Sequence, residues 1–424
     1  MPLLDGQTVP AGAPATAYHR NVAGRGRVPG GIAGCVLLLA SLVGCGGPSA
    51  SDDQTAAVQR VLDRRATAVL DRDRYAFLAT GAPATGRPAT GAAEFDNLRA
   101  VPLAAWSYRL TALHRTGDRA TADAELRYRI RGYDRAPVTA ARTLRLTRTG
   151  GRWYVSSEVP APGANEQLWE QGAVQATRGA HSLVLGVGQP QDVLRGLAHL
   201  ADRAVPSVSE AWGTGWPGHV VVLVPRTLEG MAGLLGASTA GYRGIAAVTT
   251  GEAGGATKTP ADRIIVNPNA YGSLGSLGKQ VVLTHETTHV ATRDRTTPAT
   301  PLWLSEGYAD WVGYRGSGRT PAQVAPELGR SLAAGDVPAT LPDDADFAFA
   351  GDAGKLARAY EGGWMACRMI TDRWGEARLN DFYRAVGEHR ERAGAVEDAL
   401  KKVLGTTPQE FTRQWRAYLT AQLG

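Results

Sequence analysis

Cysteine is scarce in this chain, with three residues in 424. Cys35 and Cys45 lie in or directly after an uncharged N-terminal stretch, which leaves Cys367 alone in the rest of the chain. One cysteine cannot form an internal disulfide, so a scaffold held by disulfides is excluded. Cys367 stands in an apolar run beside two methionines, where we expect it to be a core residue.

Long runs of one charge are also missing. The formal net charge is +6, and the basic residues are scattered among acidic ones without an interleaved aromatic motif. A clustered basic stripe is the usual sign of nucleic-acid binding, so we expect no nucleic-acid partner. The length exceeds what one hydrophobic core usually supports and predicts two domains.

The N-terminus has no apolar run of the about 20 residues that a transmembrane helix needs. Three arginines precede an uncharged stretch from Gly30 to Gly44, which is typical of a secretory signal peptide, so we assign residues 1–44 to one. The stretch ends in Leu-Val-Gly-Cys45 and resembles the lipobox of bacterial lipoproteins. The resemblance implies a lipid on Cys45, a flexible tether over residues 45–53, and a location on the outer face of the cell membrane. An ordinary signal peptide or a short membrane anchor stays open.

The overall pattern predicts an α+β protein. Residues 54–163 begin with a helical stripe of Val58, Val61 and Leu62, and strands of alternating polarity follow from Ala122 onward. A helix followed by a curved antiparallel sheet resembles the cone-shaped nuclear transport factor 2-like fold. We expect this part to act as a spacer or to present substrate, and a pocket for a small ligand stays open.

Residues 164–178 are expected to form a linker helix or loop, and residues 179–424 a second domain. This domain should hold a small sheet followed by a mostly helical C-terminal half. We predict that its strand Ile264-Ile265-Val266 lies at the edge of the sheet. An extended peptide could then pair with that edge.

Histidine is rare as well, with eight residues in the chain, yet two of them stand in the stretch HETTH. His285 and His289 lie four residues apart, so a helix places both imidazoles on one face, where they can hold one metal ion. Glu286 between them is then the candidate general base. This is the H-E-x-x-H arrangement of zinc peptidases.

A catalytic zinc site takes a third protein ligand. Thr292 and Arg295 stand where the metzincin pattern would have Gly and His, so a third histidine of that kind is excluded. Glu306, on a predicted following helix, is the candidate third ligand, although a helix N-terminus favours such a carboxylate in any case. Asp310 is the candidate partner for the far nitrogen of a zinc histidine.

HETTH followed by WLSEGYADW resembles the gluzincins, in particular the peptidase MA-like domains related to aminopeptidase N. The segment Ala359-Tyr-Glu-Gly-Gly resembles that family's Y-E-x-G segment. The resemblance covers roughly residues 180–424. It implies one Zn²⁺ per chain held by His285, His289 and Glu306, and it implies that Tyr360 hydrogen-bonds the oxyanion of the tetrahedral intermediate.

The chain departs from aminopeptidase N at one place. The family's G-x-M-E-N segment, whose glutamate holds the free amine of the substrate, is missing, and Glu252 in a glycine-rich stretch is a poor substitute. Exo- and endopeptidase activity on a peptide or protein substrate both stay open. A disused peptidase domain that serves as a surface binding or scaffold lipoprotein is the alternative, and hydrolysis of a non-peptide substrate is a third. The sequence is silent on the oligomeric state.

Overall fold

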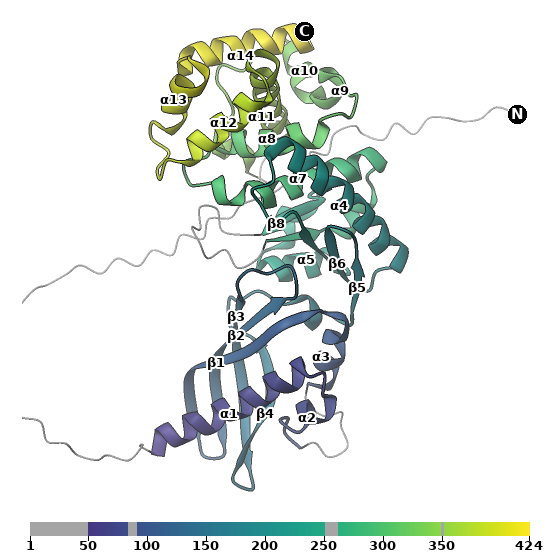
Figure 1. Ribbon diagram of the computed structural model, residues 1–424, viewed down its shortest axis with the longest axis vertical. Helices are drawn as coiled ribbons and strands as arrows, with labels where there is room; N and C mark the ends of the chain where they lie inside the picture. The colour runs from purple at the N-terminus through teal and green to yellow at the C-terminus, as the bar shows by residue number, and fades with distance from the viewer. Residues whose placement is uncertain (1–49, 84–90, 251–261, 349–351) are drawn as a thin grey trace, which may run out of the picture.

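The computed structural model describes residues 50–83, 91–250, 262–348 and 352–424. Figure 1 shows an N-terminal part in purple and blue, a second sheet in teal, and a helical part in green and yellow, following one another along the long axis. The predicted signal peptide, Cys45 and Glu252 lie outside the described residues. Among those that are described, no helix is long and apolar enough to cross a membrane.

The N-terminal part is a helix laid across a four-stranded antiparallel sheet in the order β1-β2-β3-β4 (Figure 1). Its elements, in chain order, are α1 (Ala50–Leu70), α2 (Arg74–Leu78), α3 (Ala92–Asn97), η1 (Leu98–Ala100), β1 (Leu103–Thr116), β2 (Arg119–Ile130), β3 (Val138–Thr149) and β4 (Arg152–Pro160). α1 already begins inside the segment 45–53 that we expected to be a flexible tether.

Sequence periodicity explains these elements. Val58, Val61 and Leu62 form the buried stripe of α1, as predicted, and every second residue of β2 is buried. Gly150 and Gly151 have positive φ angles and form the turn between β3 and β4, a conformation that glycine adopts without strain.

The second part contains a five-stranded mixed sheet in the order β5-β6-β7-β9-β8. Its elements, with the helices between them, are η2 (Leu168–Glu170), β5 (Val174–Arg178), β6 (Ser182–Val187), α4 (Gln191–Trp212), β7 (Val220–Val224), α5 (Leu228–Leu235), η3 (Thr239–Tyr242), β8 (Ala247–Thr250) and β9 (Arg263–Val266). β6, β7 and β9 run parallel to one another, while β5 and β8 are antiparallel to their neighbours.

Two predictions about this sheet are wrong. Residues 164–178, expected as a linker helix or loop, contain η2 and β5, and β5 pairs with β6. Ile264, Ile265 and Val266 do not form an edge strand, because β9 lies between β7 and β8. β8 is the outer strand on that side of the described sheet.

The second sheet is covered on both faces, which explains why its central strands are almost continuously buried. Val184, Val222 and Ile264 belong to the core shared with α4 and the C-terminal helices. Leu185 and Ile265, which point the other way, belong to the core of the N-terminal part. The two parts of the chain therefore share a continuous hydrophobic core.

The rest of the chain is helical, as predicted, and follows the sheet. Its elements are α6 (Pro268–Gly272), α7 (Ser276–Thr292), η4 (Arg293–Arg295), α8 (Leu302–Tyr314), α9 (Pro321–Val324), α10 (Pro326–Ala333), η5 (Asp344–Phe347), α11 (Ala353–Trp374), α12 (Glu376–Gly387), α13 (Ala395–Ala399), the π-helical turn η6 (Leu400–Leu404) and α14 (Pro408–Leu423). Cys367 is buried in α11, in the core where the sequence places it.

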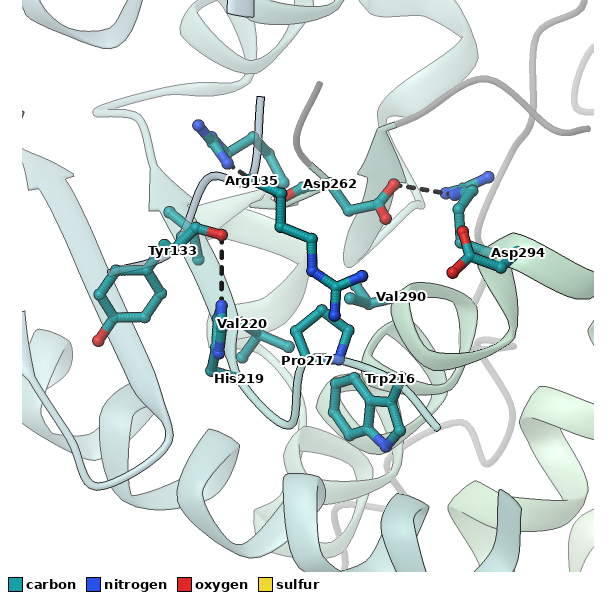
Figure 2. Close-up of a pocket in the computed structure, with 12 residues that line it drawn as sticks. Tyr133, Arg135, Trp216, Pro217, His219, Val220, Asp262, Val290 and Asp294 are labelled. Atoms are coloured by element: carbon teal, nitrogen blue, oxygen red, sulfur yellow. Dashed lines mark hydrogen bonds and ion pairs between the residues drawn. The ribbon is translucent and has the colours of Figure 1, made fainter. Parts of the chain in front are cut away.

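Polar contacts also join the two parts. Both oxygens of Asp134, from the turn after β2, accept hydrogen bonds at 2.8 Å from the guanidinium of Arg263 on β9. Beside this pair lies a pocket of about 90 Å³, and Figure 2 shows the side chain of Arg135 extending across it toward Pro217. The end of α7 reaches the same place, because Arg293 donates to Asp262 at 2.8 Å.

Candidate metal centre

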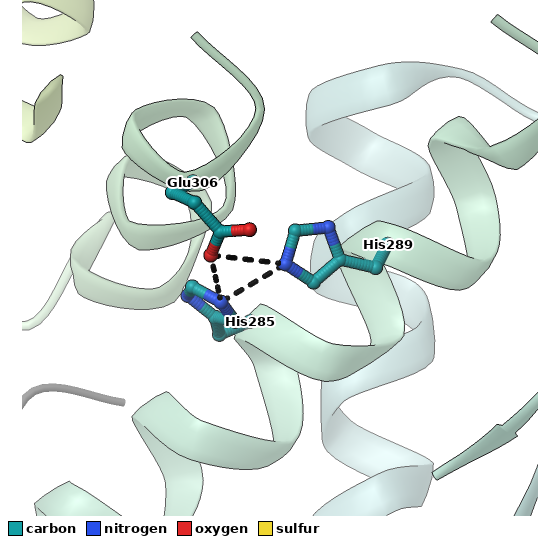
Figure 3. A group of neighbouring side chains, drawn as sticks. All are labelled: His285, His289 and Glu306. Carbon is teal, nitrogen blue, oxygen red and sulfur yellow. Dashed lines mark hydrogen bonds and ion pairs between the residues drawn. The ribbon is translucent and has the colours of Figure 1, made fainter. Parts of the chain in front are cut away.

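Two neighbouring helices carry the candidate ligands. Every residue of α7 from Val281 to Thr292 is buried, so the HETTH stretch lies in the interior. α8 brings Glu306 to it, and Figure 3 shows the three side chains converging. Nε2 of His285 and Nε2 of His289 are 3.0 Å apart, and Glu306 Oε2 lies 3.2 Å from the first and 3.5 Å from the second.

These separations fit one zinc ion. Tetrahedral ligands at about 2.1 Å from a zinc ion are about 3.4 Å from each other. The nitrogen and oxygen atoms come from buried side chains that form a possible metal-binding group. Two histidines and one glutamate are also the donor set that several catalytic zinc sites use.

Asp310 orients His285 in a way that favours a cation between the three candidate ligands. Its Oδ1 lies 2.8 Å from Nδ1 of His285 and accepts a hydrogen bond from it. In the neutral imidazole the proton is then on Nδ1, so the lone pair of Nε2 faces Nε2 of His289 and a carboxylate oxygen. Glu306 Oε2 is that carboxylate oxygen, since it lies beside both nitrogens. Three facing lone pairs in a buried site need a positive charge between them.

The ionisation of these groups supports the same conclusion. Burial by itself would lower the pKa of His285, but Asp310 and Glu306 outweigh it and raise that pKa well above its usual range. Burial likewise opposes ionisation of Glu306, yet His289 and His285 lower its pKa to about 2. The carboxylates therefore attract a cation to this point, and a bound metal ion would replace the proton on His285.

Glu286 lies beside the ligand set, with its side chain fully buried. Burial raises the pKa of Glu286 to about 7. Its Oε2 accepts a hydrogen bond of 2.7 Å from the hydroxyl of Thr249, while its Oε1 has no partner among the described residues. One oxygen is thus held and the other is left for a substrate or a water, as a general base requires.

Tyr360 comes from a third helix, α11, and is also buried. Burial, followed by the carboxylates of Glu306, Asp310 and Glu286, raises the pKa of Tyr360 well above its usual range. Glu306 also acts on Tyr360 through a side-chain hydrogen bond. The phenol stays protonated at neutral pH and can donate a hydrogen bond.

Two glycines allow α8 and α11 to approach each other. A Cβ on Gly307 would lie 2.3 Å from the backbone of Gly363, and one on Gly363 would lie 2.6 Å from the carbonyl oxygen of Trp303. No side chain fits at this crossing, which brings Glu306 and Tyr360 to the same site. The glycines of both motifs therefore have a packing role that the sequence analysis did not assign.

The structure brings together His285, Glu286, His289, Glu306, Asp310 and Tyr360. It does not bring the predicted edge strand to the site. Ile264, Ile265 and Val266 are buried on an inner strand, so no substrate can pair with them. The outer strand on this side of the described sheet is β8, which carries Thr249. The sequence analysis missed the contact between Thr249 and Glu286, and the signal for it was the position of Thr249 on a strand before the HETTH helix α7.

Comparison with known proteins adds similarity but no family. No protein-family model matches the chain, and no curated protein matches it. The solved structures that it resembles include M1 zinc metallopeptidases and an LTA4 hydrolase. Native yeast LTA4 hydrolase shares 13% identity, with 67% of this chain and 45% of that one covered and a TM-score of 0.35.

An M1 zinc metallopeptidase from Deinococcus radiodurans shares 16% identity, with 76% and 61% covered and a TM-score of 0.34. A mutant of that enzyme, bound to a Tyr-Ser-Ala substrate, shares 14% identity, with 75% and 61% covered and a TM-score of 0.32. The chain spans about half to three fifths of the length of these structures. Such low identities and TM-scores carry no conclusion about activity.

Proposed function

We propose that the chain is a zinc-dependent metallopeptidase that hydrolyses peptide bonds. The observation that supports this most directly is the convergence of two imidazole nitrogens and one carboxylate oxygen in a buried site. Beside them lies Glu286, which has one carboxylate oxygen hydrogen-bonded to Thr249. His285, His289 and Glu306 would hold one zinc ion per chain. Asp310 would fix the tautomer of His285, which strengthens that ligand.

Zinc bound there would supply Lewis acidity, lowering the pKa of a coordinated water towards about 7 and polarising the scissile carbonyl. Glu286 takes one proton from the attacking water on Oε1 while the water oxygen bonds to the carbonyl carbon. The same carboxyl then gives that proton to the amide nitrogen as the C–N bond breaks. Tyr360 donates its hydroxyl hydrogen to the oxygen that becomes negatively charged.

An extended peptide would lie along β8, the outer strand of the sheet, rather than along β9. Strand addition uses main-chain hydrogen bonds and places alternate side chains on alternate faces. The candidate ligands and Glu286 are buried in this structure. Cleavage within a chain and cleavage at a terminus both remain compatible with this arrangement.

For location, we propose a lipid anchor at Cys45 on the outer face of the cell membrane. The support is the Leu-Val-Gly-Cys45 sequence after an uncharged stretch. Cys45→Ala should release the chain from the membrane fraction and abolish lipid labelling. A variant that stays in the membrane fraction would instead point to an anchor that spans the bilayer.

The test of the enzyme is a set of variants of the purified full-length chain, assayed on a peptide library together with zinc analysis. Glu286→Gln should retain about one zinc per chain and lose at least about 100-fold in turnover, since the amide cannot accept the proton. His289→Ala should lose both metal and activity because it removes a ligand. Tyr360→Phe should keep the metal and lower the rate by a smaller factor than Glu286→Gln.

The alternative of a disused domain that only binds its partners makes the opposite forecast. Equal turnover in wild type and Glu286→Gln, with zinc bound in both, would refute the enzyme and leave a zinc-stabilised binding protein. Removal of the metal by a chelator should stop the hydrolysis, and added zinc should restore it.

A further inference from the structure

One buried hydroxyl outside the helical motifs touches the candidate general base. Thr249 stands on β8, with 1% of its surface exposed. Its Oγ1 lies 2.7 Å from Glu286 Oε2 and 3.0 Å from the backbone oxygen of the same residue. This single side chain therefore contacts both the carboxylate and the backbone carbonyl of Glu286.

The contact orients the carboxylate. A hydroxyl has one hydrogen to donate, so Thr249 holds Oε2 and leaves Oε1 as the oxygen without a partner among the described residues. Without this bond a buried glutamate could rotate its carboxylate about a terminal torsion that has broad minima. The bond thus selects the oxygen that faces the reacting water.

The position of Thr249 is fixed by the sheet. It pairs with Ile264 of β9, an inner strand that is itself paired with β7. Val248 belongs to the core on the opposite face, so strand alternation directs Thr249 toward α7. A residue placed on a paired strand is held more precisely than one on a loop, which suits a group that must align a catalytic side chain.

We propose that Thr249 is a positioning residue for the hydrolysis: it fixes the carboxylate of Glu286 and couples the outer strand β8 to the general base. This inference rests on the proposed peptidase function. A peptide that adds to β8 would engage the same strand that orients the base. The strand that binds the substrate would then also align the base. Because Thr249 acts on the base and does not bind the substrate itself, we expect its loss to affect the chemical step.

The central test replaces the hydroxyl without changing the shape of the side chain. Thr249→Val in the zinc-loaded full-length protein should lower kcat by about 10- to 100-fold, the size of effect that small misplacements of a catalytic group produce. KM should change by less than about twofold, and zinc should stay near one per chain. Thr249→Ser keeps the hydroxyl and should recover most of the lost rate.

Thr250→Val is the matched control. It makes the same change one residue along the strand, at a hydroxyl that accepts from the backbone N–H of Arg263 at 3.2 Å and does not touch the base. It should leave kcat within about twofold of wild type. An equal loss in both valine variants, or no recovery in Thr249→Ser, would reduce Thr249 to a structural residue and overturn the proposal.

Two further readouts separate this inference from the peptidase assignment. In a Glu286→Gln background, Thr249→Val should cause no further loss, because the group through which it acts is gone; a full additional loss would overturn the proposal. Crystal structures of the wild-type protein and of Thr249→Val, both with zinc, should differ at Glu286. Its carboxylate should be ordered in wild type and rotated or spread over several positions in the variant. This comparison needs no turnover, so an ordered and unmoved carboxylate refutes the positioning role even if the chain proves not to be a peptidase.

Discussion

The ion pair between Asp134 and Arg263 should be one of the most costly contacts to break in this protein. Both residues are buried, and two hydrogen bonds of 2.8 Å join their side chains. Asp134 Oδ2 also accepts from the backbone N–H of Ile130 at 2.7 Å. Arg263 begins β9, between β7 and β8, so the pair joins the N-terminal part to the centre of the second sheet.

Asp134→Ala leaves the guanidinium of Arg263 buried without its counter-ion. Removing one member of a buried pair costs about 3–5 kcal/mol, mostly because the remaining charge has lost its partner. Folded proteins are stable by only about 5–15 kcal/mol, so the loss should be visible in any denaturant titration. The double variant Asp134→Ala/Arg263→Met removes both charges and should cost less than the two single changes together.

The measurement is urea unfolding followed by tryptophan fluorescence at neutral pH, with Asp96→Ala as the control. Asp96 pairs with Arg74 on the surface, where the two side chains are 53% and 51% exposed. A surface pair of that kind contributes about 0–1 kcal/mol. If Asp134→Ala is no more destabilising than Asp96→Ala, the reasoning from burial fails.

Two other predictions follow from the structure. Gly307→Ala should destabilise the protein by about 1–3 kcal/mol and weaken zinc binding, because a methyl group would meet the backbone of Gly363; Gly329→Ala, where nothing lies within 4 Å, should be neutral or stabilising in the same thermal unfolding assay. Burial, assisted by Glu158, raises the pKa of Glu94 to about 8 from an ordinary 4.5. Between pH 4.5 and about pH 8, the folded chain thus keeps a proton that the unfolded chain releases. The free energy of unfolding should therefore fall as pH rises through this range, by at most about 1.4 kcal/mol per pH unit. Glu94→Gln should make this fall shallower in urea titrations between pH 5 and pH 8.5, and equal slopes in the two proteins would contradict the assignment.

The sequence predicted the parts of the site whose geometry is local. His285, Glu286 and His289 are one helical turn apart, so their common location follows from the helix alone. Glu306 and Asp310 lie on the next long helix in sequence, one turn from each other. Because chain neighbours of this kind pack together, a ligand and its hydrogen-bond partner could be identified from spacing and residue type.

The order of the strands could not be predicted in the same way. β8 and β9 each have four residues, and the residues of both are almost all buried. An edge strand in a layered protein usually shows one polar face, but here helices cover one face and the N-terminal part covers the other. Periodicity then carries no signal, and the edge was assigned to Ile264–Val266 rather than to β8. Thr249 was missed for the same reason, since its contact with Glu286 depends on which strand lies beside α7.

The shared core changes the physical reading of the N-terminal part. A spacer or a presenting domain needs only a small contact with the part it serves, and such contacts tend to be polar. Here Leu183, Leu185, Val221, Val248 and Ile265 of the second sheet are buried in one cluster with the N-terminal core. Removing the N-terminal part would expose this apolar face of the sheet to water, and the opposite face of β8 carries Thr249, which contacts Glu286. The chain from α1 to the metal centre is therefore expected to fold as one unit, in which the N-terminal part stabilises the sheet that positions the base.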